Sequence, residues 1–159
     1  MMSVFRSSCI GAILLEGVFM AGFAHGQTSS VQTLSLDGAR AVLRAAEQKA
    51  QQLSAPSSLA VVDVAGDLML FEQMQGARPV GIELAIGKAR SAVRYQEPTQ
   101  TLEATINGGR PAAITSQLIQ MDGGVPIRVG GAVVGAVGVS GLDKGNDIQV
   151  ANTAAAAVK

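Results

Sequence analysis

Apolar residues recur every three or four positions from residue 34 onward, which is the period of a helix with one buried face. Ser35 or Asp37 can cap the start of this helix, and Pro56 prevents its continuation. The apolar positions of the predicted helix are Leu36, Ala39, Leu43, Ala46, Ala50 and Leu53. The chain therefore enters its folded part through an amphipathic helix that needs a partner surface.

Two pairs of strands are predicted, each joined by a glycine turn. The segment 58–74 holds two apolar runs on either side of Ala65-Gly66-Asp67, a pattern typical of a hairpin with a tight turn. Farther along, 125–129 and 132–140 are strand-like and are joined by Gly130-Gly131. Strands paired in adjacent hairpins favour an antiparallel sheet with helices packed on it, which is the α+β class.

Three more helices are predicted around these strands. Pro79 lies in the first turn of a helix that runs to residue 95, and a short helix follows Pro98 and ends at the sequence GGRP. The last helix is rich in alanine, and Asn146 or Asp147 can cap its start. The stripe of the first of these helices that is predicted to face the sheet consists of Ile82, Ile86, Ala89 and Val93.

The stretch DGGVPIRVGGAVVGAVGVSG, residues 122–141, is rich in glycine. Neither a GxGxxG nor a Walker pattern fits it, so it is not predicted to bind phosphate through such a loop. Gly135 and Gly138 lie inside the second predicted strand, where a missing side chain usually marks a bulge or the close approach of another backbone or a ligand. Gly123 and Gly124 precede the first strand and are predicted to border a ligand pocket.

The composition limits the partners of the protein. A chain of 159 residues is long enough for one domain with its own core. It carries 12 basic and 12 acidic residues without blocks of like charge, which argues against nucleic acid or an anionic membrane surface as a partner. Four Phe, one Tyr and no Trp leave the core to small side chains.

Residues 1–26 have the pattern of a secretory signal peptide, with a basic residue, an apolar run and small residues before Gln27. The apolar run is shorter than the roughly 20 residues that span a bilayer, so no membrane anchor is predicted. We expect a flexible lead-in over 27–33, a single domain over 34–159, and a periplasmic or secreted location. Cleavage would remove Cys9 and His25, and with them any disulfide, cysteine nucleophile or histidine-ligated zinc.

Several blocks of the sequence resemble one known family. They are LSLDGARAVLRAAEQKA, LAVVDVAGDLMLFEQMQGA, GIELAIGKARSA, the glycine-rich stretch and the closing DIQVANTAAAA. In this order they are similar to the GlcG/HbpS-like haem-binding family, also described as the haem-degrading domain family. The resemblance implies a profilin-like α/β/α sandwich with an antiparallel sheet, assembly into homo-oligomers and, in some members, binding of haem or a related tetrapyrrole.

We therefore expect a small-molecule ligand, with haem as the cofactor, held by a binding protein without catalytic residues. Because the predicted mature chain has no His, the candidates for an iron ligand are Tyr95, Met69, Met74, Met121 and Thr99. Lys88, in GIELAIGKA and on the same helix flank as Tyr95, is the preferred cation for an anionic ligand; for each cation a solvated helix face or a salt bridge remains the alternative. The full set of predicted ligand-binding residues is Lys88, Arg90, Arg94, Tyr95, Arg110, Met121, Asp122, Gly123 and Gly124.

Two other functions remain open at this point. The chain could be an enzyme for a small anionic metabolite, with an acid, a base or an anion clamp among Asp122, Arg110, Lys88 and Glu72. It could equally be an accessory oligomer without a ligand, since a surface rich in alanine and glycine packs readily against its own copies.

Overall fold

The computed structural model describes residues 29–159. The predicted signal peptide, with Cys9 and His25, lies outside these described residues. Within 29–159 no helix is long and apolar enough to cross a membrane. The elements are α1 (Leu36–Gln52), β1 (Ser58–Asp63), β2 (Leu68–Gln73), α2 (Gly81–Tyr95), α3 (Thr99–Asn107), the 3-10 helix η1 (Pro111–Ser116), β3 (Gly124–Val129), β4 (Ala132–Ser140) and α4 (Lys144–Ala155).

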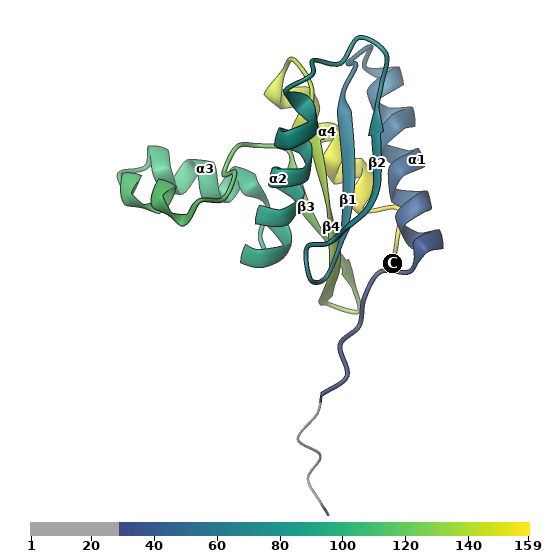
Figure 1. The fold of residues 1–159 in the computed structure, drawn as a ribbon, viewed down its shortest axis with the longest axis horizontal. Coiled ribbons are helices and arrows are strands. Elements are labelled where there is room, and N and C mark those ends of the chain that lie inside the picture. Colours follow the sequence, from purple (N-terminus) through teal and green to yellow (C-terminus); the bar gives the residue numbers. More distant parts are fainter. Residues whose placement is uncertain (1–28) are drawn as a thin grey trace, which may run out of the picture. The chain divides into compact units, whose positions relative to one another are not determined.

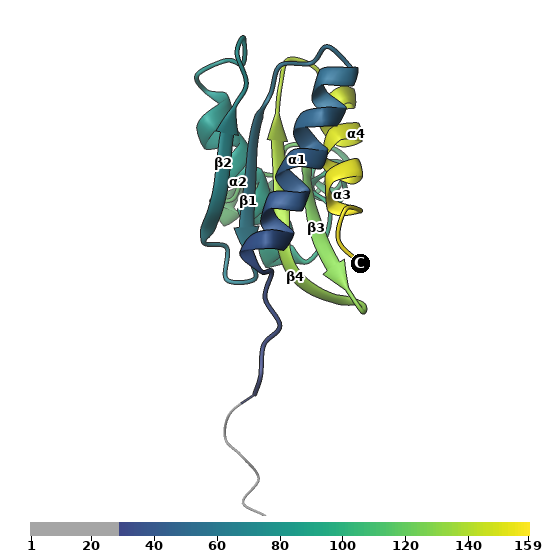
Figure 2. The ribbon, with the colours of Figure 1, turned by 90° about the vertical axis from the view of Figure 1, so that its right-hand side faces the viewer.

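A four-stranded sheet in the order β2-β1-β4-β3 forms the middle layer, and all of its neighbouring strands are antiparallel. Figure 1 shows α2 on one side of this sheet and α1 on the other. In Figure 2, α1 and α4 lie side by side on the same face. The two predicted hairpins and the α+β class are confirmed. β1 and β4, which belong to different hairpins, form the centre of the sheet.

α1 begins as predicted. Ser35 is its N-cap, and the Ser35 hydroxyl accepts a hydrogen bond of 3.1 Å from the backbone N–H of Gly38. The preceding residue, Leu34, donates its N–H to the carbonyl of Val134 at 2.8 Å, which attaches the entry of the helix to β4. The buried stripe of α1 is Ala39, Val42, Ala46 and Ala50, whereas Leu36 is exposed.

The two faces of the sheet are built from side chains of different size, because neighbouring residues of a strand point to opposite faces. The face toward α1 and α4 carries branched side chains, which with the helices form the larger core cluster. The face toward α2 carries mainly small ones. The branched set is Leu59, Val61, Val137 and Val139, and the opposite set is Ala60, Val62, Ala136 and Gly138.

The backbone of α2 packs directly against the sheet at Gly138. A Cβ atom on Gly138 would collide with the carbonyl of Ala85 and would lie 2.7 Å from the backbone nitrogen of Ala89. The close approach predicted for this glycine is thus explained by a helix backbone. The predicted stripe of α2 was partly wrong: small residues, including Ala85 and Ala89, face the sheet, and Ile82 and Ile86 are only half-buried. Larger side chains cannot fit where two backbones meet.

The start of α4 also differs from the prediction. Its N-cap is Asp143, and the Asp143 carboxylate accepts a hydrogen bond of 2.9 Å from the N–H of Asn146. Asn146 and Asp147 both lie inside the helix. Predicting either of them as the cap was wrong because the helix begins three residues earlier, which turns Asp147 toward the interior.

α3 and η1 extend away from the layers (Figure 1), and we call residues 99–120 the arm. α3 packs mainly on η1 and has only a few contacts with α2 and β3. The base of the arm is fixed where Gly124 donates its N–H to the hydroxyl of the buried Thr99 at 2.8 Å. Most side chains of the arm beyond this base are exposed.

Candidate ligand-binding sites

Predicted site residues or their neighbours line three cavities that are named below, and Asp122 also lines a fourth, of about 220 Å³, beside α3. The α1–β2 groove, about 470 Å³, contains Glu47, Glu72 and Met74. The arm pocket, about 340 Å³, is lined by Tyr95, Leu102, Thr105, Arg110, Ala112, Ala113 and Gln120. The corner cavity, about 170 Å³, lies where α2, the end of β4 and the start of α4 meet, and is lined by Arg78, Leu84, Lys88, Glu103, Met121, Asp122, Ser140, Gly141, Leu142, Lys144 and Asp147.

The arm pocket brings together residues from α2, α3 and η1. Tyr95 is the last residue of α2 and Arg110 immediately precedes η1. Gln120 holds the turn of η1 in place, because its amide donates to the carbonyl of Ala113 at 2.7 Å and to the hydroxyl of Ser116 at 2.6 Å. Tyr95 is 40% exposed, so its ring is accessible from solvent. The pocket therefore offers a phenol and a guanidinium group beside small apolar walls.

A buried ion pair closes the inner end of the corner cavity. Lys88 is 3% exposed, and its Nζ donates to Asp147 Oδ2 at 3.0 Å and to the carbonyl of Val139 at 2.9 Å. Asp147 Oδ1 accepts the N–H of Gly141 at 2.7 Å. Burial raises the pKa of Asp147 in spite of the opposing charge of Lys88. The pair ties α2, β4 and α4 together at one point.

A second polar cluster lies at the outer end of the same cavity. Glu103 Oε2 accepts the N–H of Asp122 at 2.8 Å, and Lys144 Nζ lies 3.4 Å from both Glu103 Oε1 and Asp122 Oδ2. Burial raises the pKa of Glu103, but the hydrogen bond from Asp122 and the charge of Lys144 outweigh it and lower the pKa overall. Hydrogen bonds to Asp122 and Glu103 raise the pKa of Lys144. Both shifts favour the charged forms of Glu103 and Lys144 at neutral pH.

Gly123 and Gly124 connect this cluster to the sheet. Gly123 has φ of +108°, which favours glycine, and its carbonyl accepts the N–H of Val139 at 2.8 Å. A Cβ atom on Gly124 would collide with the carbonyl of Lys88. These glycines bring the chain against α2, whereas the sequence predicted that they border a ligand.

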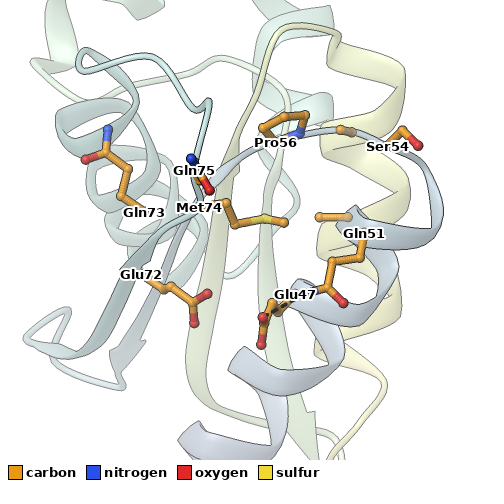
Figure 3. Close-up of a pocket in the computed structure, with 10 residues that line it drawn as sticks. Glu47, Gln51, Ser54, Pro56, Glu72, Gln73, Met74 and Gln75 are labelled. Carbon is orange, nitrogen blue, oxygen red and sulfur yellow. Dashed lines mark hydrogen bonds between the residues drawn. The ribbon is translucent and has the colours of Figure 1, made fainter.

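The α1–β2 groove is acidic. Figure 3 shows the carboxylates of Glu47 and Glu72 directed toward each other, with Met74 deeper in the groove. Gln51 donates its amide to Glu47 Oε1 at 2.8 Å. Burial and the negative charge of Glu47 raise the pKa of Glu72. This groove has the largest volume of the three but no basic residue in its lining.

The structure divides the predicted site residues among separate places. Tyr95 and Arg110 share the arm pocket, and Lys88, Met121 and Asp122 share the corner cavity. The remaining predicted cations lie elsewhere: Arg90 donates its Nε to the carbonyl of Gly66 in the β1–β2 turn at 3.1 Å, and the exposed Arg94 lies close to the same turn. Glu72 is in the α1–β2 groove, so the four residues considered for an enzyme do not share one cavity.

Sequence reasoning missed the partners of Lys88 and Asp122. Asp147 was treated as a helix cap, and Lys144, Glu103 and Arg78 were not singled out. Asp147 follows Lys88 by 59 positions, so local spacing holds no signal for the pair. Among the described residues, His, Cys, Asp and Glu form no group of three or more that could hold a metal ion.

The chain belongs to the HbpS-like haem-degrading family. The model of this family, described as "Haem degrading protein HbpS-like", matches residues 34–156. The predicted family is thereby confirmed.

Similar individual proteins support the same assignment. Protein GlcG of Escherichia coli K12 is 38% identical over 108 residues, which cover 67% of this chain and 81% of the relative. The crystal structure of HbpS has a TM-score of 0.77 at 30% identity and covers 84% of this chain and 95% of that chain. The structure described as the PduOC:heme complex has a TM-score of 0.72 at 30% identity and covers 80% and 96%. These structures confirm the predicted fold.

Proposed function

We propose that this domain binds haem or a related tetrapyrrole in the arm pocket and does not transform it. The observation that carries the proposal is that Tyr95, the one tyrosine of the chain, and Arg110 line the same pocket, whose walls include both apolar and hydroxyl-bearing side chains. A family relative described as a haem complex supports the ligand class. Bound haem would supply an iron centre with two propionate groups.

The residues of the arm pocket fit this group chemically. A tyrosine oxygen can ligate haem iron, and a guanidinium group binds a carboxylate through charge-assisted hydrogen bonds. The described residues contain no His or Cys, and Thr99 is buried with its hydroxyl engaged at Gly124. Leu102, Ala112 and Ala113 supply walls on which a flat ring can lie. Tyr95 is thus the iron ligand and Arg110 the propionate partner in this proposal.

The size of the pocket supports a further part of the proposal, that the protein is a homo-oligomer. A pocket of about 340 Å³ is smaller than a haem, so part of the ring would extend beyond it. Ile114, in η1, is 68% exposed, and a second copy that packs on the arm would cover both this side chain and the projecting part of the ring. Sedimentation of purified protein tests this: a mass of one chain in the presence of haem contradicts it.

The location of the protein completes the proposal. We infer secretion or export to the periplasm from the signal-like pattern of residues 1–26. Sequencing the N-terminus of the protein recovered outside the cytoplasm tests it, and an uncleaved chain retained inside the cell contradicts it.

Titration with haem tests the ligand. We expect a shifted Soret band for the wild type, loss of the iron-ligand signature in Tyr95→Phe, and about tenfold weaker binding in Arg110→Gln, because one charge-assisted hydrogen bond is lost. Arg44→Gln, on the exposed side of α1, is the matched control and should bind as the wild type does. A wild type without a Soret shift, or a Tyr95→Phe spectrum identical to that of the wild type, would overturn the assignment.

A further inference from the structure

The corner cavity contains cationic groups with unused hydrogen-bonding capacity. Arg78 is exposed at its mouth, where it reaches only the carbonyl of Gly141, at 3.4 Å, and forms no ion pair with any described residue. Lys88 uses two of its donors, on Val139 and Asp147, so its third N–H group has no hydrogen-bond partner among the described residues. These groups can bind the oxygens of an anion.

The same cavity contains one unused acceptor. The side chain of Asp122 is 5% exposed; its Oδ2 lies 3.4 Å from Lys144, but its Oδ1 has no hydrogen-bond donor within reach among the described residues. A buried carboxylate oxygen without a donor is unfavourable, and such atoms are rare in folded proteins. The cavity therefore matches a molecule that presents one donor beside its negative charge.

We propose that the corner cavity binds a small oxyanion that also carries a hydroxyl group, such as a short hydroxycarboxylate or hydrogen phosphate. The anionic oxygens lie against Arg78 and the free N–H of Lys88, and the hydroxyl donates to Asp122 Oδ1. This site is separate from the arm pocket and does not depend on haem binding.

Size and charge narrow the ligand class. A volume of about 170 Å³ equals the share of roughly six water molecules, so only a molecule of a few non-hydrogen atoms fits. An ammonium group is a poorer donor to Asp122 than a hydroxyl, because Lys144 already places a positive charge beside that carboxylate. Leu84, Met121 and Leu142 give the cavity an apolar side, which suits a short carbon chain more than a highly charged ion.

Thermal unfolding with three probes at equal ionic strength tests the site. We expect lactate or inorganic phosphate to raise the melting temperature of the full chain above its value in chloride. The probe with the larger increase shows whether the site prefers a carboxylate or a phosphate. Propionate has the carboxylate of lactate without the hydroxyl, and should bind about tenfold more weakly than lactate. If neither lactate nor phosphate exceeds chloride, the proposal is wrong.

Two substitutions separate the roles of the side chains. Arg78→Gln should weaken the binding of lactate and of phosphate by about tenfold or more, since it removes the exposed cation. Asp122→Ala should remove the advantage of lactate over propionate. Arg40→Gln, on α1, is the control and should leave all probes unchanged. Equal binding in Arg78→Gln and Arg40→Gln would overturn the proposal even where Asp122→Ala fails to fold, and a normal haem titration of Arg78→Gln would keep this result distinct from the haem proposal.

Discussion

The two faces of the sheet pack against helices through side chains of different size. Toward α1 and α4, branched residues such as Val61 and Val139 fill the space between the layers. Toward α2, Gly138 leaves no space to fill, and helix and strand backbones are in contact. On the face toward α1 and α4, side chains can shift slightly when a methyl group is removed. On the face toward α2, backbone atoms cannot change rotamer, so there is no space for an added methyl group.

This difference bears on the arm pocket and the corner cavity, which both include side chains of α2. Lys88 and Tyr95 both project from the helix whose distance from the sheet is fixed by direct backbone contact. A ligand site needs side chains that are held within a fraction of an ångström of their binding positions. The larger core on the other face supplies most of the buried apolar surface, while the backbone contact of α2 fixes the position of its side chains.

The largest effect is expected for Gly138→Val. The added side chain would meet the backbone of α2, so the helix must leave the sheet and the protein should fail to fold. Val139→Ala, the next residue on the opposite face, should cost only about 2–3 kcal/mol of unfolding free energy. Urea denaturation followed by circular dichroism measures both. Gly145→Ala, in the helical α4, is the control; its Cβ atom would meet only the end of the Asp143 side chain, at 3.1 Å, so a change in stability far smaller than that of Gly138→Val is expected. A folded Gly138→Val protein of wild-type stability would show that the two faces do not differ.

A smaller effect is expected for Lys88→Met. It leaves Asp147 buried without its partner, and breaking such a pair costs about 3–5 kcal/mol. The double variant with Asp147→Asn should lose less than Lys88→Met alone, because no unpaired charge remains. Denaturation of the two single variants and the double variant gives the coupling energy. Losses that simply add would contradict the role of the pair in fixing α2.

The smallest effect is expected at Glu103, on the outer side of the corner cavity. Its pKa lies below the ordinary value of 4.5, so its contribution to stability is present above that value and is lost as the pH falls through the lowered pKa. Glu103→Gln should therefore lose less stability than the wild type on acidification. Melting temperatures between about pH 6 and pH 3 provide the comparison. Parallel curves for the two proteins would refute the effect.

Local signals in the sequence predicted most of the fold. The Ser35 cap, the glycine turns and the apolar strand segments each depend on neighbouring residues, and each is confirmed. The orientation of α2 was partly wrong because hydrophobicity favoured Ile82 and Ile86, whereas the geometry at Gly138 admits only small residues. Periodicity identifies an apolar stripe, but the space between the helix and the sheet decides which residues of the helix face the sheet.

The candidate sites were less predictable because their groups come from distant parts of the chain. Tyr95 and Arg110 meet through the path of the arm, and Lys88 meets Asp147 through the sheet. The sequence marked Lys88 and Asp122 as chemically interesting, but it could not reveal that one has a buried partner and the other a free oxygen. Such pairings depend on three-dimensional contact.

The hydrogen bond between the Gly124 N–H and the Thr99 hydroxyl has a consequence for protein engineering. Because this contact closes the chain at the base of the arm, residues 100–123 form a loop whose ends stay together whatever lies between them. The entropy of closing a loop grows only slowly with its length, so added residues have a small thermodynamic cost. We expect the exposed Gly108-Gly109 tip to accept an inserted peptide or reporter domain while the three layers remain folded.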